Sequence, residues 1–553
     1  MAPQPEPALQ RPEAGQPFSR TPHAVGDSGD MRSVSFLKRC ALLFLALLLV
    51  LGVSLHFCLW KSGMFIDEIY TFGLSNSSYM PFIGNGASER LSEQTLTRED
   101  IFDYLAVTEN ETRFDAGSVY YNQVRDVHPP LHYWIINFCS SLAAGHFSKW
   151  IGLIPDLLIY LGTLVLLYAL GMELFGSEWV SAAAVLLYGL SRVGLSTAMM
   201  IRMYVLVCFF TVLLALLTAK ELRAPSRGKE LGIAAVIFLG LMTQYYFVFY
   251  AFFLCALTVF VLLYRRQWKA AGFFTLFSFL AVGLMLLCFP AVFTQMTGHR
   301  LGPESDALEN LKNVSAWAGR LRYYFGQLRV GLPVAVGSAI ATLVLVAVLA
   351  LRTHGLRVQK ADFRFLVLLL PVLPTVAVAA LLSPVLEGRY IYNIMPVCVL
   401  FPCFCLMLYS RYASPQSWCV MLAVLSLIWS LRTVPDYIYD EHRTYNDLVR
   451  PYADCPCVYL TGYYAAPTQD LLQLMVFRDV HVTEDPASDG LAAYLADSSA
   501  DACVVYIDVD STWGSGFDTQ AAVSGLLEET DYTVSEHLYS YALSSTWLLT
   551  KSS

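Results

Sequence analysis

Two short sequences in this chain carry residue types that suit catalysis at a membrane surface. One is FIDEIY at residues 65–70, directly after the first apolar segment, and the other is DVHPPL at residues 126–131, directly before the next. They lie at the two ends of one loop, residues 61–130. Ionisable residues are costly at a membrane boundary and are usually kept there for function. The two sequences together predict an enzyme at one face of a bilayer, acting on a substrate that the lipid delivers.

Asp67 and Glu68 are adjacent in the first sequence. On a helix, neighbouring side chains point about 100° apart, so the two carboxylates cannot face the same atom. This predicts a division of labour in which one carboxylate accepts a proton or hydrogen bond from a reacting hydroxyl and the other orients a loop or partner. Taken alone, the pair also fits an interfacial or helix N-terminal acidic pair without catalytic function.

The second sequence places Asp126 and His128 before two prolines. Proline fixes its own φ and moves the preceding residue toward extended backbone, which gives a rigid entry into the next helix. Such a turn at the membrane surface would present a hydrogen-bond donor to a phosphate. Proline is also common in the first turn of ordinary helices, so the dipeptide alone is weakly informative.

Two arginines stand beside tyrosines at the ends of later apolar segments, Arg202 with Tyr204 and Arg389 with Tyr390. Arginine is always charged and binds phosphate through two parallel hydrogen bonds. If both lie on the same side of the membrane as Asp67, they can neutralise a lipid phosphate or pyrophosphate. Arginine and tyrosine also occur at helix ends simply because they reach the interface.

Composition identifies the elements that must position these residues. Of the 553 residues 56% are hydrophobic and only 14% are charged, and the mean hydropathy is +0.52. A soluble domain carries about 25% charged residues, so this is a polytopic membrane protein. The net charge of -8, without a basic stripe, argues against nucleic acid as a partner. Ten of the 13 cysteines lie in or beside apolar segments, and the rest form no disulfide framework.

The first 35 residues are rich in Pro, Glu, Gln and Ser and are predicted to be a disordered cytoplasmic tail. The apolar segment 40–60 follows basic residues and reads as a signal anchor, which places the loop 61–130 outside. Further apolar segments lie at 131–147, 150–172, 178–196, 202–220, 231–264, 270–292, 331–351, 365–382, 391–409 and 418–431. We expect 11 to 13 spans in a membrane domain at residues 36–431.

Two places in this membrane domain depart from simple crossings. The segment 231–264 is long enough for two helices hinged at residues 243–246. Between 131 and 220, four crossings would put the basic connector 220–229 outside, against the charge rule. One segment there is therefore predicted to be broken or re-entrant, as is tolerated where backbone lines a polar cavity.

Residues 450–553 are predicted to form a small extracytoplasmic α/β domain, because apolar strings alternate with helical stretches. The expected strands are 457–460, 480–482, 503–507, 532–539 and 546–549, and the expected helices are 467–476, 490–496 and 519–529. The domain is a candidate for binding the acceptor, for stabilising the molecule or for capping it.

Taken together, these sequences resemble the GT-C glycosyltransferases, in particular the protein O-mannosyltransferase and lipid A aminoarabinose transferase group and its bacterial membrane branch. The resemblance spans about residues 36–410 and rests on the order of Asp67-Glu68, DVHPPL, Arg202-Met203-Tyr204, Gln244-Tyr245-Tyr246 and Arg389-Tyr390 with Pro396. One departure is residues 243–245, Thr-Gln-Tyr, where the family has a histidine-containing patch.

The resemblance implies a cell-envelope enzyme with a polyprenyl-phosphate sugar donor, a lipid, glycan or protein acceptor and an inverting reaction. It implies Asp67 as the base and Glu68 as its support. The donor phosphate and substrate would be bound by Asp126, His128, Arg202, Tyr204, Gln244, Tyr245, Arg389 and Tyr390. No metal ligands are expected, although some branches use a divalent ion, which leaves Asp67 with Asp126 as an alternative ion site.

Two other classes of protein share some of these features. A lipid or glycan transporter would also have many spans, broken helices and membrane-embedded arginines. It predicts similar halves and charges at mid-membrane, whereas here the halves show no similarity and the charges gather at one boundary. A sensor or assembly subunit would explain the α/β domain but neither Asp67-Glu68 nor His128-Pro129-Pro130.

Overall fold

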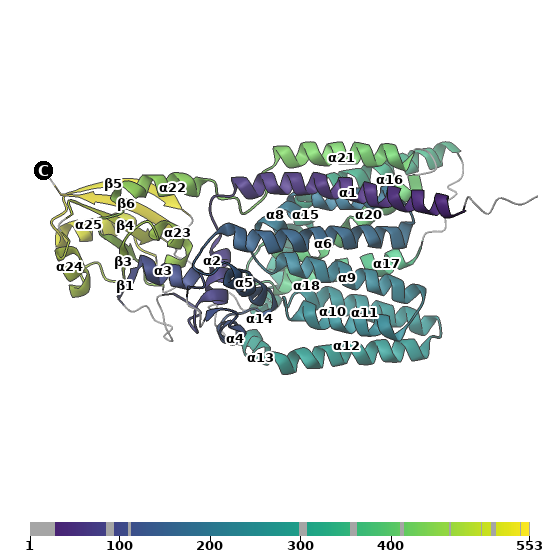
Figure 1. The fold of residues 1–553 in the computed structure, drawn as a ribbon, viewed down its shortest axis with the longest axis horizontal. Coiled ribbons are helices and arrows are strands. Elements are labelled where there is room, and N and C mark those ends of the chain that lie inside the picture. The colour runs from purple at the N-terminus through teal and green to yellow at the C-terminus, as the bar shows by residue number, and fades with distance from the viewer. Residues whose placement is uncertain are drawn as a thin grey trace, which may run out of the picture.

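The computed structural model describes residues 28–83, 93–108, 112–297, 307–353, 362–409, 414–463, 466–498, 500–509, 516–541 and 543–551. Over these residues a bundle of long helices is joined at one end to a layer of strands and short helices (Figure 1). The predicted polytopic helical protein with a C-terminal α/β domain is confirmed. Most of the predicted disordered tail, residues 1–35, lies outside the described residues, but residues 28–35 already belong to the first helix.

The elements of the bundle and its connections follow in chain order. They are α1 (Ser28–Trp60), α2 (Ile66–Asn76), α3 (Arg98–Leu105), α4 (Ala116–Arg125), α5 (Leu131–Leu142), α6 (Lys149–Phe175), α7 (Glu178–Gly189), α8 (Arg192–Met199), α9 (Tyr204–Arg223), α10 (Arg227–Leu241), α11 (Phe247–Tyr264), α12 (Trp268–Cys288), α13 (Val292–Thr297), α14 (Ala307–Lys312), α15 (Val314–Gly331), α16 (Pro333–Thr353), α17 (Arg364–Leu369), α18 (Val372–Leu382), η3 (Gly388–Ile394), α19 (Met395–Cys398), α20 (Leu400–Tyr409) and α21 (Pro415–Arg432).

Among the described residues, seven segments are long and apolar enough to cross a membrane, or up to nine if two bent pairs each count as one span. This is below the predicted 11 to 13, because several apolar segments form helices shorter than the roughly 20 residues that a bilayer requires. The helix α5 has 12 residues, and α10 has 15. The predicted hinge at 243–246 is present as the break between α10 and α11.

The short α5 also resolves the crossing problem between 131 and 220. If α5 stays at the end of the bundle where it begins, α6 crosses once, the pair α7 and α8 returns with a 60° bend, and α9 crosses again. The basic connector after α9 then lies at the end opposite the loop 61–130, as the charge rule requires. The segment that does not cross is thus α5, and the α7–α8 pair is a bent crossing.

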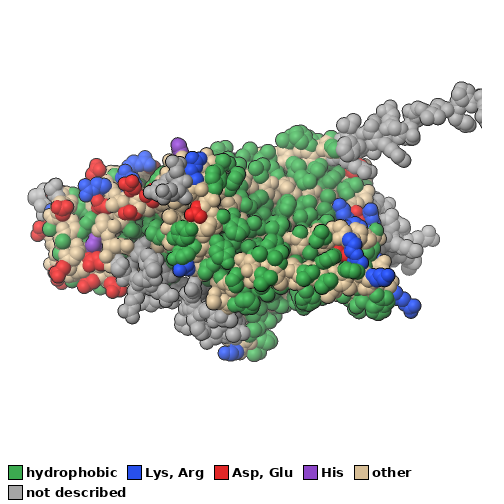
Figure 2. Space-filling view, turned by 60° about the horizontal axis from the view of Figure 1, so that its bottom comes forward, with side chains coloured by type: hydrophobic (Ala, Val, Ile, Leu, Met, Phe, Trp, Pro, Cys, Tyr) green, Lys and Arg blue, Asp and Glu red, His purple; other side chains and the backbone are tan. Residues whose placement is uncertain are grey.

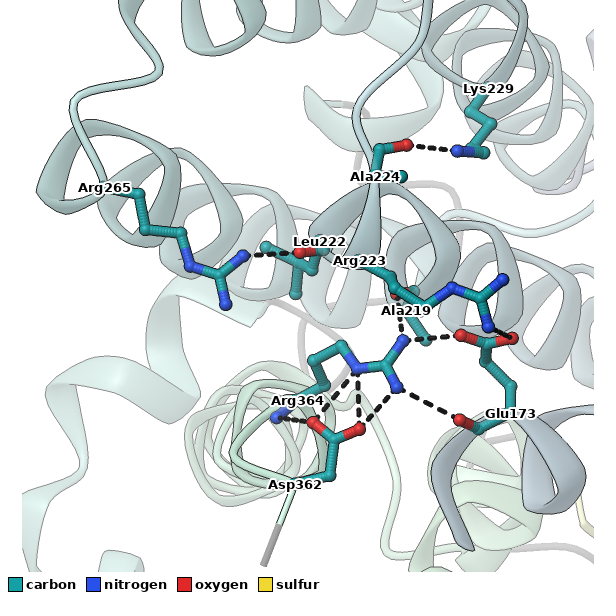
Figure 3. Close-up of polar contacts among 9 residues, drawn as sticks. All are labelled: Glu173, Ala219, Leu222, Arg223, Ala224, Lys229, Arg265, Asp362 and Arg364. Carbon is teal, nitrogen blue, oxygen red and sulfur yellow. Dashed lines mark hydrogen bonds and ion pairs between the residues drawn. The ribbon is translucent and has the colours of Figure 1, made fainter. Parts of the chain in front are cut away.

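Charge is sorted along the long axis of the molecule. Figure 2 shows a broad apolar belt, with acidic side chains and some basic ones over the strand layer, and mainly basic side chains at the other extremity. At that basic end, Arg364 ties three helices together (Figure 3). It bonds Glu173 Oε1 at 2.5 Å and the carbonyl oxygen of Ala219 at 2.9 Å, and Arg223 reaches the same Glu173 at 3.1 Å. We call this the basic end and the other, which carries α2, the site end.

The strand layer is one sheet of six strands in the order β1-β3-β2-β4-β6-β5. Its strands are β1 (Gln94–Thr97), β2 (Cys457–Leu460), β3 (Asp479–Thr483), β4 (Ala502–Asp508), β5 (Val534–Tyr541) and β6 (Ser544–Thr550). Its helices are α22 (Glu441–Val449), η4 (Arg450–Tyr452), η5 (Ala466–Asp470), α23 (Leu471–Leu474), α24 (Asp489–Ala496) and α25 (Thr519–Glu529). The strands β3, β2 and β4 are parallel and almost wholly buried, as expected for strands covered on both faces.

One strand of this sheet comes from far away in the sequence. The strand β1, within the loop 61–130, pairs antiparallel with β3, from Gln94 opposite Val482 to Thr97 opposite Asp479. The helix η5, which follows β2, contacts α2. The loop 61–130, with FIDEIY near its start and DVHPPL at its end, is therefore held by the sheet as well as by the bundle.

Candidate functional site

Glu68 holds the start of α2 in place. Its side chain is fully buried and accepts hydrogen bonds from Lys61 Nζ at 2.9 Å, from the N–H of Phe65 at 2.7 Å and from the N–H of Ile201 at 2.9 Å. The bond to Phe65 satisfies an N–H just before the helix, as a capping glutamate does. Glu68 thus joins the end of α1, the start of α2 and the turn before Arg202, which is an orienting function.

Asp67 instead meets two guanidinium groups. Its side chain is 20% exposed, Arg389 contacts its Oδ2 atom, and Arg202 lies 3.9 Å from its Oδ1 atom. Arg202 also donates to the carbonyl oxygen of Asp67 at 2.6 Å. Burial works to raise the pKa of Asp67, but the charges of Arg389, Arg202 and His128 outweigh it and hold the pKa below its ordinary value. Asp67 is therefore an ionised acceptor of hydrogen bonds in this arrangement.

Asp126 and His128 lie next to this group. The Nδ1 atom of His128 is 3.0 Å from Asp126 Oδ2 and 3.3 Å from a terminal nitrogen of Arg202. After the two prolines, the N–H of Leu131 donates to the carbonyl oxygen of Met242 at 3.1 Å, which fixes the entry to α5 against the α10–α11 break. Asp67, Asp126, His128, Arg202 and Arg389, predicted from separate parts of the sequence, thus form one connected cluster.

The other predicted residues lie around this cluster. Tyr390 follows Arg389 and stacks on Tyr246, with ring centroids 4.8 Å apart. Tyr204 is buried in the core, where its ring lies 6.1 Å from that of Tyr392.

Gln244 and Tyr245 form hydrogen bonds outside the cluster. Gln244 accepts from the N–H of Tyr246, and Tyr245 donates to Gln295 at 2.5 Å. Over the part of the chain that the structure describes, neither side chain hydrogen-bonds to Asp67 or to the two arginines, so their role in substrate binding stays a prediction.

Sequence reasoning missed four features around the cluster, which are Lys61, Glu387, a cavity and the pair of Arg192 with Asp436. Lys61, directly after the first apolar segment, pairs with Glu68, and Glu387 pairs with Arg389 Nε at 2.5 Å. A cavity of about 330 Å³ opens beside Arg389. Polar and aromatic side chains line much of it, among them Arg192, Tyr323, Gln327, Glu387, Asp436 and Tyr437. Lys61 and Glu387 stood beside the residues already singled out, but the partnership of Arg192 and Asp436, at 2.6 Å, had no signal in the sequence.

The described residues around Asp67 and Asp126 are not arranged to bind a metal ion. Over the part of the chain that the structure describes, no group of three or more His, Cys, Asp or Glu side chains is arranged to hold a metal ion. Asp67 and Asp126, the alternative ion site, face Arg389 and His128 respectively. Two guanidinium groups at Asp67 repel a cation, so the described residues do not fit a divalent ion there.

Comparison with known proteins agrees with the resemblance seen in the sequence. Residues 127–293 match the family model described as dolichyl-phosphate-mannose-protein mannosyltransferase. The matched segment starts within DVHPPL and includes Arg202 and Gln244. The predicted resemblance to the GT-C glycosyltransferases is confirmed over this segment, which is less than a third of the chain.

Solved structures were also compared with the whole chain. The crystal structure of ArnT from Cupriavidus metallidurans bound to undecaprenyl phosphate is 11% identical, with a TM-score of 0.47 over 91% of this chain and 97% of that one. The arabinosyltransferase EmbB from Mycobacterium smegmatis is 11% identical, with a TM-score of 0.39 over 90% of this chain and 46% of that one. No curated protein matches the chain in sequence.

Proposed function

We propose that this chain is a membrane glycosyltransferase of the GT-C class, which moves a sugar from a polyprenyl-phosphate donor to an acceptor hydroxyl with inversion at the sugar carbon. The observation that carries the proposal is the cluster of Arg202, Arg389 and His128 around Asp67 at the site end of an apolar bundle. Cationic donors at the lipid boundary suit a lipid-linked phosphate, and the matched family is named for such a donor.

In the proposed reaction the acceptor oxygen attacks the anomeric carbon while the bond from that carbon to the phosphate oxygen breaks. Charge accumulates on the leaving phosphate, where Arg202 and His128 stabilise it as preorganised donors. The proton of the acceptor hydroxyl passes to Asp67. Arg389 contacts Asp67 Oδ2, whereas Arg202 stays 3.9 Å from Oδ1, so the acceptor hydroxyl approaches Asp67 at Oδ1. Glu387 pairs with Arg389 and helps to hold its guanidinium group in place.

The proposal includes an orientation in the membrane. The basic end carries the connectors 220–229 and 265–269, and basic residues favour the cytoplasmic side. The site end and the sheet are therefore placed outside, where a lipid-linked sugar would reach Asp67 from the leaflet. The cavity beside Arg389 supplies the space for the acceptor sugar or hydroxyl.

The test uses the full-length protein in lipid nanodiscs with radiolabelled polyprenyl-phosphate sugars and a membrane extract as the source of acceptor. We expect transfer by the wild type and a loss on the order of 100-fold or more in Asp67→Asn, as for removal of a general base. The matched control is Asp497→Asn, at an exposed position on the sheet domain, which should transfer normally. Undiminished transfer by Asp67→Asn would remove Asp67 from the mechanism, and no transfer from any donor by the wild type would refute the proposed donor class.

A further inference from the structure

A second cavity, separate from the one beside Arg389, lies where three parts of the molecule meet. It has a volume of about 270 Å³ and we call it the basic cleft. It is lined by Lys61, Ser62, Lys149, Arg443, Asn446, Asp447 and Arg450. Lys61 and Ser62 follow α1, Lys149 opens α6, and the others belong to α22 and the residue after it.

The charges of the basic cleft are unbalanced. It has four cations and one carboxylate, and that carboxylate, Asp447, lies 3.6 Å from Arg450. Lys61 is neutralised by Glu68. Two positive charges, on Lys149 and Arg443, remain without a carboxylate partner among the described residues.

The hydrogen bonds of these two side chains leave their charges uncompensated. Lys149 Nζ donates to the carbonyl oxygen of Lys61, and to that of Leu59 at 3.4 Å. Arg443 donates to Ser62 Oγ at 3.3 Å. Neutral oxygens satisfy N–H groups but do not cancel positive charge, and like charges in one cleft repel. An anion in the cleft would relieve this repulsion, and the N-terminus of the 27-residue helix α6 adds to its attraction.

The surroundings of the cleft place it at the membrane surface. The spans α1 and α6 end and begin there, at Trp60 and Lys149. Leu59 is 67% exposed, as expected for a side chain that faces lipid, and Lys149 lies 5.5 Å from the ring of Trp150. Tryptophan and long basic side chains collect at the headgroup level of a bilayer.

We propose that the basic cleft binds the phosphate of an anionic lipid headgroup from the leaflet at the site end, with Lys149 and Arg443 as its principal contacts. Ser62 and Asn446 supply neutral hydrogen-bonding groups beside them. The inference does not depend on the proposed reaction, since neither Lys149 nor Arg443 belongs to the Asp67 cluster. It does connect the two sites, because Lys61 lines the cleft and bonds Glu68 at the start of α2.

The test places the full-length protein in nanodiscs that contain both phosphatidylglycerol and phosphatidylcholine. The protein is then released, and native mass spectrometry measures which lipid stays bound to it. The wild type should retain phosphatidylglycerol over phosphatidylcholine. The variant Lys149→Gln/Arg443→Gln should lose this preference on the order of ten-fold or more, because two charge-assisted contacts are removed. The charge-preserving variant Lys149→Arg/Arg443→Lys should keep most of it.

Two further arms complete the design. Arg478→Gln removes an arginine directly before β3, outside the cleft, and should retain the lipid as the wild type does. Arg443→Gln alone changes an exposed side chain and should weaken retention even if the double variant does not fold. Equal retention by the wild type and Arg443→Gln would overturn the proposal. Displacement of the lipid by equimolar inorganic phosphate would overturn its assignment to a lipid headgroup.

Discussion

At the scale of single residues, Asp67 and Glu68 are neighbours with opposite surroundings. Glu68 is fully buried against a lysine and two backbone N–H groups, whereas Asp67 is partly exposed between two arginines. The predicted division of labour follows from helix geometry, since adjacent positions on α2 point to different neighbours. The family resemblance implied that Glu68 is the supporting carboxylate. The residue types alone did not show this, because nothing in the sequence indicated that Lys61 and Ile201 are its partners.

This contrast predicts that substituting Glu68 lowers stability, whereas substituting Asp67 lowers sugar transfer. Glu68→Gln leaves the buried Lys61 without its partner, so we expect a loss of stability of roughly 3–5 kcal/mol. In the variant Lys61→Met/Glu68→Gln the loss should be smaller than the sum of the two single losses, because the pair is removed together. Thermal unfolding of the four proteins in detergent measures this coupling.

Asp67→Asn is the matched comparison, since it sits one residue away and should keep a melting temperature near that of the wild type while losing transfer. Additive effects of Lys61→Met and Glu68→Gln would show that the two side chains do not stabilise each other. A melting temperature for Asp67→Asn as low as that of Glu68→Gln would argue against the division of labour.

At the scale of elements, the sequence predicted those with a strong apolar pattern and missed those without one. The strand β2 was predicted with its observed bounds, because its residues form a short apolar run between turns. The strand β1, with the sequence QTLT, has only one apolar residue and became a strand by pairing with β3. Similarly, α5 ends at Leu142, before Gly145 takes a φ of +77°, and is too short for the span that its apolar composition indicated.

The pairing of β1 leads to a prediction about the loop 61–130. Leu96 is the buried residue of β1 and packs into the main core. Leu96→Ala should remove about 2–5 kcal/mol of packing free energy. Because β1 is a short edge strand, we expect this loss to appear as local detachment of β1 from the sheet. Limited proteolysis should then cut the loop faster, and hydrogen exchange at residues 94–97 should rise. Asp103→Ala, at an exposed position of α3, is the control. Unchanged proteolysis in Leu96→Ala would mean that β1 does not fasten the loop.

At the scale of the whole molecule, the site depends on contacts that join distant parts of the chain. Asp67 and Arg389 are 322 positions apart, and the sequence marked both without indicating that they meet. Their meeting requires α2 to be held by the bundle through Glu68 and by the sheet domain through η5. Such contacts are set by packing among many helices, which is why the residues of the site were predictable and their pairing was not.

Two titratable side chains near this junction give the molecule opposing responses to pH. Burial raises the pKa of Asp470, on η5, to about 7, although Tyr459 and Ser544 donate hydrogen bonds to it. Burial, reinforced by the charge of Lys61, lowers the pKa of His442, on α22, to about 4. The folded protein holds the proton of Asp470 more tightly than the unfolded chain does, and that of His442 less tightly.

The signs follow from proton linkage. Between about pH 4 and 7, Asp470 makes the free energy of unfolding fall as pH rises, because the folded state binds more protons there. Between about pH 4 and 6.5, His442 makes it rise with pH, because the unfolded state binds more. Between about pH 4 and 6.5 the two contributions to the free energy of unfolding change with pH in opposite directions, so their sum in the wild type is small. Substituting one of the two residues leaves the contribution of the other visible.

We therefore expect Asp470→Asn to gain stability relative to the wild type as pH rises from 4 to 7, and His442→Gln to gain relative stability as pH falls from 6.5 to 4. Each trend approaches about 1.4 kcal/mol per pH unit within its window. Melting temperatures of the three full-length proteins at half-unit pH steps measure the differences, which cancel the contributions of all other groups. A pH-independent difference for Asp470→Asn would show that this carboxyl titrates alike in the folded and unfolded states. The contact of η5 with α2 would then be no source of pH sensitivity at the site end.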